Sequence, residues 1–343
     1  MSTSSILELQ SRQSNRYRAS AGNNPEVAVE AAESPIGMLN FVDGTPTEDT
    51  IHRLHDNLDR THGLEVFLKN HSGVSLYRLW KAQRRRNLEH DQVRLYHGAF
   101  PSQLQLPRTS KFEGWCSIDL EKDGATIIDL PPDLLGVVVD MWFRLVGDLG
   151  PAALDGGRGG KYLILPPHQQ LEIADDCRIL RPKTNRVWLF LRTLRVRCDS
   201  DFSRIANELG IRSLSVEQGL RRIEIADASK LAFQGGVLND HSFFEDLDRL
   251  VQAEPFGALD RESYNLLASI GIVKGKPFRP GSRMKRISRE AAIIGRATVR
   301  AMAQKRPHGG SLFRNPSAAA GPLLPRRTER ALVSYQRGSR KEA

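Results

Sequence analysis

The stretch that decides the fold runs from residue 125 to residue 149 and reads ATIIDLPPDLLGVVVDMWFRLVGDL. Its apolar residues form short runs rich in β-branched side chains, and Pro131, Pro132 and Gly147 interrupt them. Such runs are typical of strands, because β-branched side chains pack well on a pleated surface. The stretch therefore predicts two strands, over residues 125–130 and 136–146.

Similar short segments lie on both sides of this stretch, with no long helical pattern between them. They cover residues 93–96, 116–120, 161–165, 177–180 and 186–197. A series of short strands bounded by Gly, Pro, Asp or Asn is typical of antiparallel sheets that pack face to face. The middle of the chain is therefore predicted to be an antiparallel β-sandwich, interrupted by one helix over residues 202–209.

Apolar residues at helical spacing flank this strand-rich middle on both sides. Before it, the spacing predicts three helices, with breaks near Gly63 and before Ser75. After it, helices are expected over residues 241–253, 260–269 and 282–302. The predicted fold class is α+β: an antiparallel β-sandwich core with helical N-terminal and C-terminal flanks and a disordered basic tail.

The charge of the chain is concentrated at its C-terminal end. The 343 residues include 50 Lys and Arg against 40 Asp and Glu, a net charge of +10. Residues 279–343 hold 16 of these bases and three acids, so they carry +13 and the rest of the chain carries −3. Residues 304–343 are rich in Pro, Gly, Ser and Arg without an apolar period, which predicts a disordered tail that binds anionic surfaces non-specifically.

The remaining composition limits the class of protein. Residues 1–34 are polar and predict a mobile arm, which leaves residues 35–303 as one domain. No run approaches the roughly 20 apolar residues of a membrane-spanning helix, and the N-terminus lacks the apolar core of a secretory signal. The three cysteines are widely spaced and the histidines are scattered. The sequence therefore predicts no disulfide, no metal site and no cofactor. We expect a cytoplasmic protein. The sequence does not identify its partners, and a homo-oligomer is one of the alternatives.

The best candidate for a binding surface is the segment from Asp140 to Leu145. If it continues as a strand, period-two alternation places Asp140, Trp142 and Arg144 together on one face. An aromatic ring flanked by charged groups suits a sugar or another planar ligand. With Asp148 and Lys161 nearby in the sequence, these residues form the predicted ligand site; the alternative is an ion pair covered by a helix, a domain or a second subunit.

Two other segments resemble known motifs only in part. The Gly-rich residues 155–161 lack the first Gly and the Ser or Thr of a phosphate-binding loop, and they lead into a strand. Residues 202–222 place Ala206, Gly210 and Val216 at the spacing of a helix-turn-helix, with Arg221 and Arg222 able to reach phosphates. The first segment is therefore interpreted as a turn and the second as a connecting helix.

Several motifs taken together resemble a known family. They are the residues 34–48, 55–59, 140–144 (DMWFR), 148–150, 159–167 (GGKYLILPP), 184–188 (TNRVW) and 270–278 (IGIVKGKPF). In combination these are similar to the bacterial family called domain of unknown function 1254, over roughly residues 34–303. The resemblance implies helices followed by a β-rich domain, and it implies no established chemistry.

The chain also departs from what the resemblance implies. Most members continue into a second β-sandwich, domain of unknown function 1214, and many carry a secretion signal, neither of which is found here. Residues 102–111 replace a strand that is usual in the family. The expectation is therefore a truncated or divergent member.

Three functions follow from these observations. The first is a non-catalytic binding or structural module. The second is an enzyme acting on a carbohydrate or another polar small molecule, for which Asp140 and Asp148 would supply the two carboxylates. The third is a DNA-binding protein that uses residues 202–222. The sequence favours the first and leaves the question of enzymatic activity open.

Overall fold

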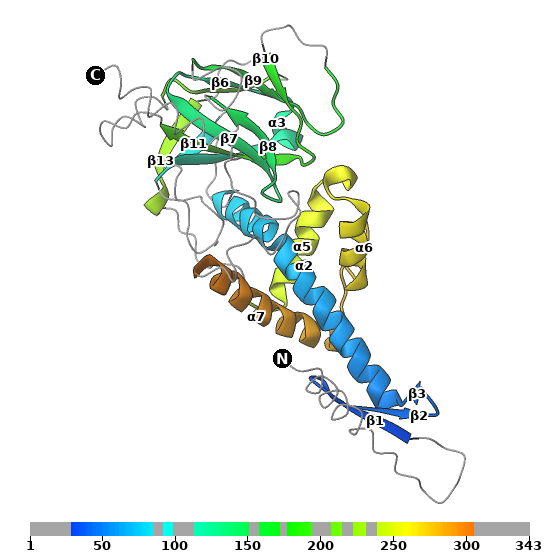
Figure 1. Ribbon diagram of the computed structural model, residues 1–343. Helices are drawn as coiled ribbons and strands as arrows, with labels where there is room; N and C mark the ends of the chain where they lie inside the picture. The colour runs from blue at the N-terminus through cyan, green and yellow to red at the C-terminus, as the bar shows by residue number, and fades with distance from the viewer. Residues whose placement is uncertain are drawn as a thin grey trace, which may run out of the picture. The chain divides into compact units, whose positions relative to one another are not determined.

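The computed structural model describes residues 29–84, 92–98, 113–150, 158–171, 177–193, 207–214, 222–230 and 239–304 (Figure 1). The chain divides into two units, one up to Gly63 and one from Leu64 onward. Helices and strands are both present in quantity, which confirms the predicted α+β class. Among the described residues, none of the helices combines the length and the apolar composition that a membrane span requires.

The first unit is a small antiparallel sheet followed by the start of a helix. Its strands are β1 (Val29–Ser34), β2 (Gly37–Val42) and β3 (Thr45–Pro46), and the helix is α2 (Glu48–Arg84). Thr50 connects the start of α2 to β2, because its hydroxyl accepts a hydrogen bond from the Asn40 amide at 2.8 Å. Residues 29–34, expected to belong to a mobile arm, thus form a strand; residues 1–28 lie outside the described part of the chain.

Helix α2 runs without a break through the region where three helices were predicted. Gly63 lies inside it and is buried. Glycine costs a helix about 1 kcal/mol relative to alanine, but it does not end a helix that packing supports. Here Val66, Phe67 and Val74 are fully buried on the following turns, so tertiary contacts outweigh the local cost.

Two larger sheets make up the strand-rich middle of the second unit. The six-stranded sheet has the order β13-β4-β5-β11-β7-β8, and the four-stranded sheet has the order β10-β9-β6-β12. The six strands are β13 (Arg222–Asp227), β4 (Gln92–His97), β5 (Gly114–Asp119), β11 (Arg186–Thr193), β7 (Leu134–Asp140) and β8 (Leu145–Leu149). The four are β10 (Cys177–Leu180), β9 (Gly160–Ile164), β6 (Thr126–Leu130) and β12 (Gly210–Ser213).

The sheets are mixed, whereas purely antiparallel sheets were predicted. The strands β13 and β4 pair in parallel, and so do β10 and β9. The other pairings in these two sheets are antiparallel. Both parallel pairs lie at a sheet edge, so the central strands follow the predicted arrangement and the edge strands do not.

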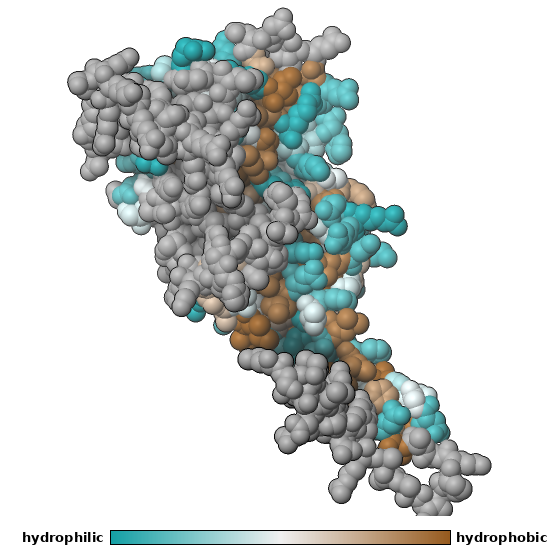
Figure 2. All heavy atoms as spheres, viewed as in Figure 1, coloured by the Kyte–Doolittle hydropathy of each residue, from teal (hydrophilic) through white to brown (hydrophobic). Residues whose placement is uncertain are grey.

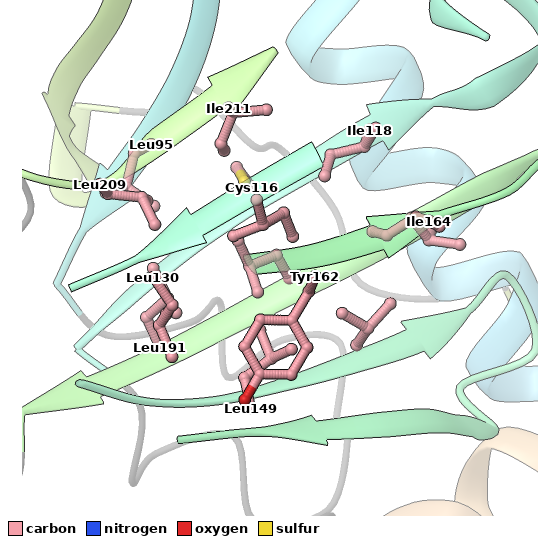
Figure 3. Close-up of a cluster of buried hydrophobic side chains, with 14 of the residues drawn as sticks. Leu95, Cys116, Ile118, Leu130, Leu149, Tyr162, Ile164, Leu191, Leu209 and Ile211 are labelled. Carbon is pink, nitrogen blue, oxygen red and sulfur yellow. The ribbon is translucent and has the colours of Figure 1, made fainter. Parts of the chain in front are cut away.

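A hydrophobic cluster lies between the two sheets (Figure 3). The six-stranded sheet contributes Cys116, Val138 and Leu189, and the four-stranded sheet contributes Ile128 and Tyr162. Because side chains alternate between faces along a strand, every second residue of β11 enters this cluster, whereas Trp188 and Phe190 belong to a second cluster on the other face. The six-stranded sheet is therefore buried on both faces.

Helices supply the partners for that second face. The C-terminal helices are α5 (Ser242–Ala253), α6 (Arg261–Ser269) and α7 (Ser282–Gln304), which confirms the three helices predicted there. Short helical turns are α3 (Leu120–Asp123), η3 (Ala228–Lys230) and η4 (Phe256–Ala258). Leu76 and Leu79 of α2 and Leu250 of α5 pack into the cluster that contains Trp188 and Phe190.

One predicted strand is a hairpin instead. Residues 136–146 do not continue in one direction, because β7 ends at Asp140 and β8 begins at Leu145. The Asp140 amide donates to the Arg144 carbonyl at 2.9 Å, which closes the turn. Phe143 has a φ of 63°, a left-handed conformation that is uncommon for a non-glycine residue, and this allows the chain to reverse.

The structure also contradicts the helix-turn-helix arrangement proposed for residues 202–222. Gly210, expected in a turn between two helices, opens strand β12, which pairs with β6. Arg222, expected on the second helix, begins strand β13, which pairs with β4. Residues 201–206 and 215–221 lie outside the described residues, as does most of the predicted helix over 202–209.

Candidate functional site

The β7–β8 hairpin brings three of the predicted site residues together. One oxygen of the Asp140 carboxylate accepts the amides of Trp142 and Arg144, at 2.9 and 3.0 Å. Its other oxygen accepts Arg144 Nε at 2.6 Å. The Arg144 guanidinium carbon also lies 5.7 Å from the centre of the Trp142 ring. The three side chains therefore form one connected group, built by the turn and not by strand alternation.

The hairpin is held against helices on one side. Trp142 Nε1 donates to Asn70 Oδ1 on α2 at 2.9 Å, and Arg144 Nη2 donates to the Ala258 carbonyl of η4 at 2.6 Å. Gly73 on α2 allows the close approach, because a Cβ there would lie 3.2 Å from both the Met141 carbonyl oxygen and Trp142 Cδ1. The ion pair between Asp140 and Arg144 is thus covered by helical residues.

A second buried ion pair lies next to the hairpin in the sheet. Arg186 begins β11, and Val187 pairs with Asp140. Arg186 Nη1 donates to Glu254 Oε1 at 2.8 Å, and the Asn185 amide donates to Glu254 Oε2 at 2.6 Å. The Glu254 side chain has no exposed surface and that of Arg186 is 8% exposed. This pair connects the start of β11 to the end of α5.

Other groups surround Arg186. Its Nη2 lies 3.1 Å from Glu121 Oε2, and its Nε lies 3.5 Å from Asp119 Oδ2. Its guanidinium carbon lies 4.5 Å from the centre of the Trp80 ring on α2, in cation–π geometry. One arginine thus contacts side chains from the sheet, from α3, from α2 and from the residue that follows α5.

The residues just described form a polar junction between the six-stranded sheet and the helices. We define the junction as Asn70, Asp140, Trp142, Arg144, Arg186 and Glu254. Burial raises the pKa of the Asp140 carboxyl and raises that of Glu254 to about 6, whereas the neighbouring arginines oppose both shifts. Both carboxylates accept hydrogen bonds from the protein on both oxygens.

This arrangement limits the chemistry of the junction. A general acid or base must come within hydrogen-bond distance of a reacting group, at about 2.6–3.2 Å. Asp140 and Glu254 instead contact backbone amides and arginines of the chain itself. Trp142 is partly buried and packs against two hydrophobic clusters, and its Nε1 is bonded to Asn70. In the structure, the junction connects the six-stranded sheet to α2, η4 and the end of α5.

The other two predicted site residues lie elsewhere. Asp148 is half-buried on β8 and pairs with Val137. Lys161 is exposed on β9 of the four-stranded sheet, opposite Asp129. A ligand-binding role for Asp140, Trp142, Arg144, Asp148 and Lys161 stays a prediction. Among the described residues, no three His, Cys, Asp or Glu side chains are grouped to hold a metal ion.

Comparison with known proteins finds one family whose model is similar to part of the chain. The model of a family described as a protein of unknown function, DUF1254, matches one continuous stretch. Residues 99–209 match the DUF1254 family. The predicted resemblance is confirmed over this stretch, which holds the hairpin and Arg186, whereas Asn70 and Glu254 lie outside it. No curated protein matches the chain.

A solved structure shares the fold. The crystal structure of the VPA0106 protein from Vibrio parahaemolyticus is 13% identical, with a TM-score of 0.50 over 72% of this chain. The chain covers 60% of the length of that protein. At this identity the likeness concerns the arrangement of the backbone and not the activity.

Sequence reasoning missed several junction residues. Arg186 was noticed only as part of the TNRVW motif, and Glu254 and Asn70 were not singled out. Glu254 lies 68 residues from Arg186, and Asn70 lies 72 residues from Trp142. No local pattern records contacts at such separations. A charged residue directly after a predicted amphipathic helix is the one signal that could have pointed to Glu254.

Proposed function

We propose that this chain is a non-catalytic structural or binding module, in which a β-sandwich is fixed to a helical layer by the junction. The observation that carries the proposal is that Asp140 and Glu254, both buried, direct all their carboxylate oxygens to donors of the chain itself. Removing one partner of such a pair leaves a buried charge without compensation, which costs about 3–5 kcal/mol. The junction residues are therefore assigned to stability.

A double-mutant cycle on the hairpin tests this assignment. We expect Arg144→Met to lower the free energy of unfolding by about 3 kcal/mol, because Asp140 then stays buried beside an apolar side chain. Adding Asp140→Asn should restore part of that loss, since the uncompensated charge is removed. Urea denaturation followed by tryptophan fluorescence measures both variants against wild type. Equal stability of wild type and Arg144→Met would contradict the proposal.

The alternative of an enzyme or sugar-binding protein is tested away from the junction. Asp148 and Lys161 do not belong to the junction, so Asp148→Ala and Lys161→Ala probe the predicted ligand site without removing a junction residue. Wild type is screened with mono- and oligosaccharides for turnover and for a saturable change in fluorescence. Activity or binding that Asp148→Ala abolishes while the variant stays folded would establish a site there and overturn the non-catalytic assignment.

A further inference from the structure

Helix α7 has one face that is fully used in packing. Ile287, Ala291 and Ala292 on this face have no exposed surface. Gly295 lies so close to α2 that a Cβ there would be 2.3 Å from Phe67 Cδ1. The two alanines and Gly295 allow α7 to lie directly against α2 (Figure 1). This contact fixes the orientation of the other face of α7.

The other face of α7 is basic and exposed. The helix contains six Arg or Lys against one acid, Glu290, which pairs with Arg286 at 3.0 Å. The exposed bases are Arg283, Lys285, Arg286, Arg289 and Arg300. Elsewhere on the molecule, the surface that Figure 2 shows has hydrophobic and hydrophilic residues intermixed.

Two large apolar side chains are exposed on α7, Ile293 within this basic face and Ile294 at its edge. Ile293 is 50% exposed and Ile294 is 44% exposed, although a helix of a soluble fold normally turns isoleucine toward the core. At 100° per residue, Ile293 falls between Arg286, Arg289 and Arg300 on the helix surface. Bases attract anionic headgroups, and an apolar side chain exposed among them gains by entering the boundary between headgroups and acyl chains.

We propose that the exposed face of α7 binds the surface of a membrane that contains anionic lipids. The bases meet the headgroup phosphates and the two isoleucines enter the apolar boundary below them. A nucleic acid would attract the same bases, but it would gain little from two isoleucines, and α7 has no aromatic residue to stack on bases. The inference goes beyond the proposed function and does not depend on the junction.

The full-length protein is tested by sedimentation with vesicles of phosphatidylcholine mixed with phosphatidylglycerol, and with phosphatidylcholine alone. One variant removes charge: Lys285→Gln, Arg289→Gln and Arg300→Gln together. Its control removes the same charge from exposed positions elsewhere: Lys122→Gln, Lys183→Gln and Arg261→Gln together. A third variant, Ile293→Ser with Ile294→Ser, removes only the apolar side chains. Every protein keeps the basic C-terminal residues 305–343, so their contribution cancels.

We expect wild type to bind the anionic vesicles and not phosphatidylcholine alone. The α7 charge variant should bind about a hundredfold more weakly, since each base near an anionic membrane contributes about fivefold. The isoleucine variant should bind about tenfold more weakly, whereas the control should match wild type. An α7 charge variant that binds like the control would overturn the proposal. So would an isoleucine variant with unchanged vesicle binding, or tighter binding of wild type to duplex DNA or to an acidic protein.

Discussion

His71 lies in α2 with its imidazole buried. Burial, helped by the charge of Arg296, lowers its pKa to about 4, so the ring is neutral in the folded protein at neutral pH. Its Nε2 has no hydrogen-bond partner, and its ring centroid lies 6.0 Å from that of Phe67. Protonating this residue in place is therefore unfavourable.

The pKa of His71 predicts a loss of stability in acid. Between pH 6.5, the ordinary pKa, and about pH 4, the unfolded chain takes up a proton at His71 and the folded protein does not. Falling pH then favours the unfolded state, by about 3 kcal/mol over this range. The free energy of unfolding measured across this range should fall with pH in wild type. In His71→Leu this contribution should be absent; an identical pH dependence in both proteins would contradict it.

Glu254 predicts a contribution of the opposite sign. Burial raises its pKa to about 6, above its ordinary value of 4.5. Between these values the folded protein holds a proton that the unfolded chain does not, so its contribution to stability grows as pH falls from 6 to 4.5, by about 2 kcal/mol. Above pH 6 the carboxylate is charged and accepts hydrogen bonds from Arg186 and the Asn185 amide. Because its pKa is raised, this charged form is less favourable in the folded protein than in the unfolded chain.

The test for Glu254 is a comparison with Glu254→Gln. Glutamine keeps the shape but does not titrate, so the difference in unfolding free energy between the two proteins should change between pH 6 and 4.5 and stay constant from pH 7 to 8. Because His71 is present in both proteins, its contribution cancels in the difference. A difference that does not vary with pH would show that Glu254 titrates normally in the folded state.

At the scale of elements, Gly295 explains how closely α7 approaches α2. A Cβ at this position would lie 2.3 Å from Phe67 Cδ1 and 2.7 Å from its Cγ. Alanine normally stabilises a helix by about 1 kcal/mol relative to glycine. Phe67 is fully buried and cannot move away without displacing the cluster around it. Packing therefore outweighs helix propensity at this position.

We expect Gly295→Ala to lower the free energy of unfolding by about 1–3 kcal/mol, the usual cost of overpacking a core. Gly281→Ala, just before the first residue of α7, is the matched control, because a Cβ there meets nothing within 4 Å. That variant should be neutral within about 0.5 kcal/mol. Chemical denaturation checks both. A stabilised Gly295→Ala would show that the two helices can separate at little cost.

The elements that the sequence predicted well are those with a regular period. The helix α5 keeps Phe243, Leu247 and Leu250 at helical spacing, and each is fully buried. The β7–β8 hairpin was missed because its turn contains no Gly, Asn or Pro, and Met141 and Phe143 keep the alternation of a strand. The turn depends on the left-handed Phe143 and on contacts with α2 and η4, which local sequence does not record.

At the scale of the whole molecule, features that depend on local sequence were predicted, and contacts between distant residues were not. The β-rich middle and its helical flanks follow from local composition, because each strand and helix carries its own pattern. The pairing partners of the edge strands β10 and β13, and the ion pairs of the junction, join residues far apart in the chain. These contacts depend on topology, and no local window of the sequence encodes them.

One hydrogen bond crosses the cluster between the two sheets. The Tyr162 hydroxyl, on β9 of the four-stranded sheet, accepts the Gly150 amide directly after β8 of the six-stranded sheet, at 3.0 Å. Arg178 Nη1 donates to the same oxygen at 3.1 Å. The tyrosine is 1% exposed, and Figure 3 shows its hydroxyl directed toward Leu149. The buried Gly150 amide therefore depends on a side chain of the opposite sheet.

Tyr162→Phe keeps the ring and removes the oxygen, which leaves the Gly150 amide buried without that acceptor. We expect the free energy of unfolding to fall by about 1–3 kcal/mol, the cost of an unsatisfied buried donor. Tyr264→Phe is the control, because that hydroxyl donates to the Phe256 carbonyl at a more exposed position, and it should cost less. Hydrogen exchange at the Gly150 amide should accelerate in Tyr162→Phe even under native conditions. If the two sheets are held together by apolar packing alone, exchange and stability will instead match those of wild type.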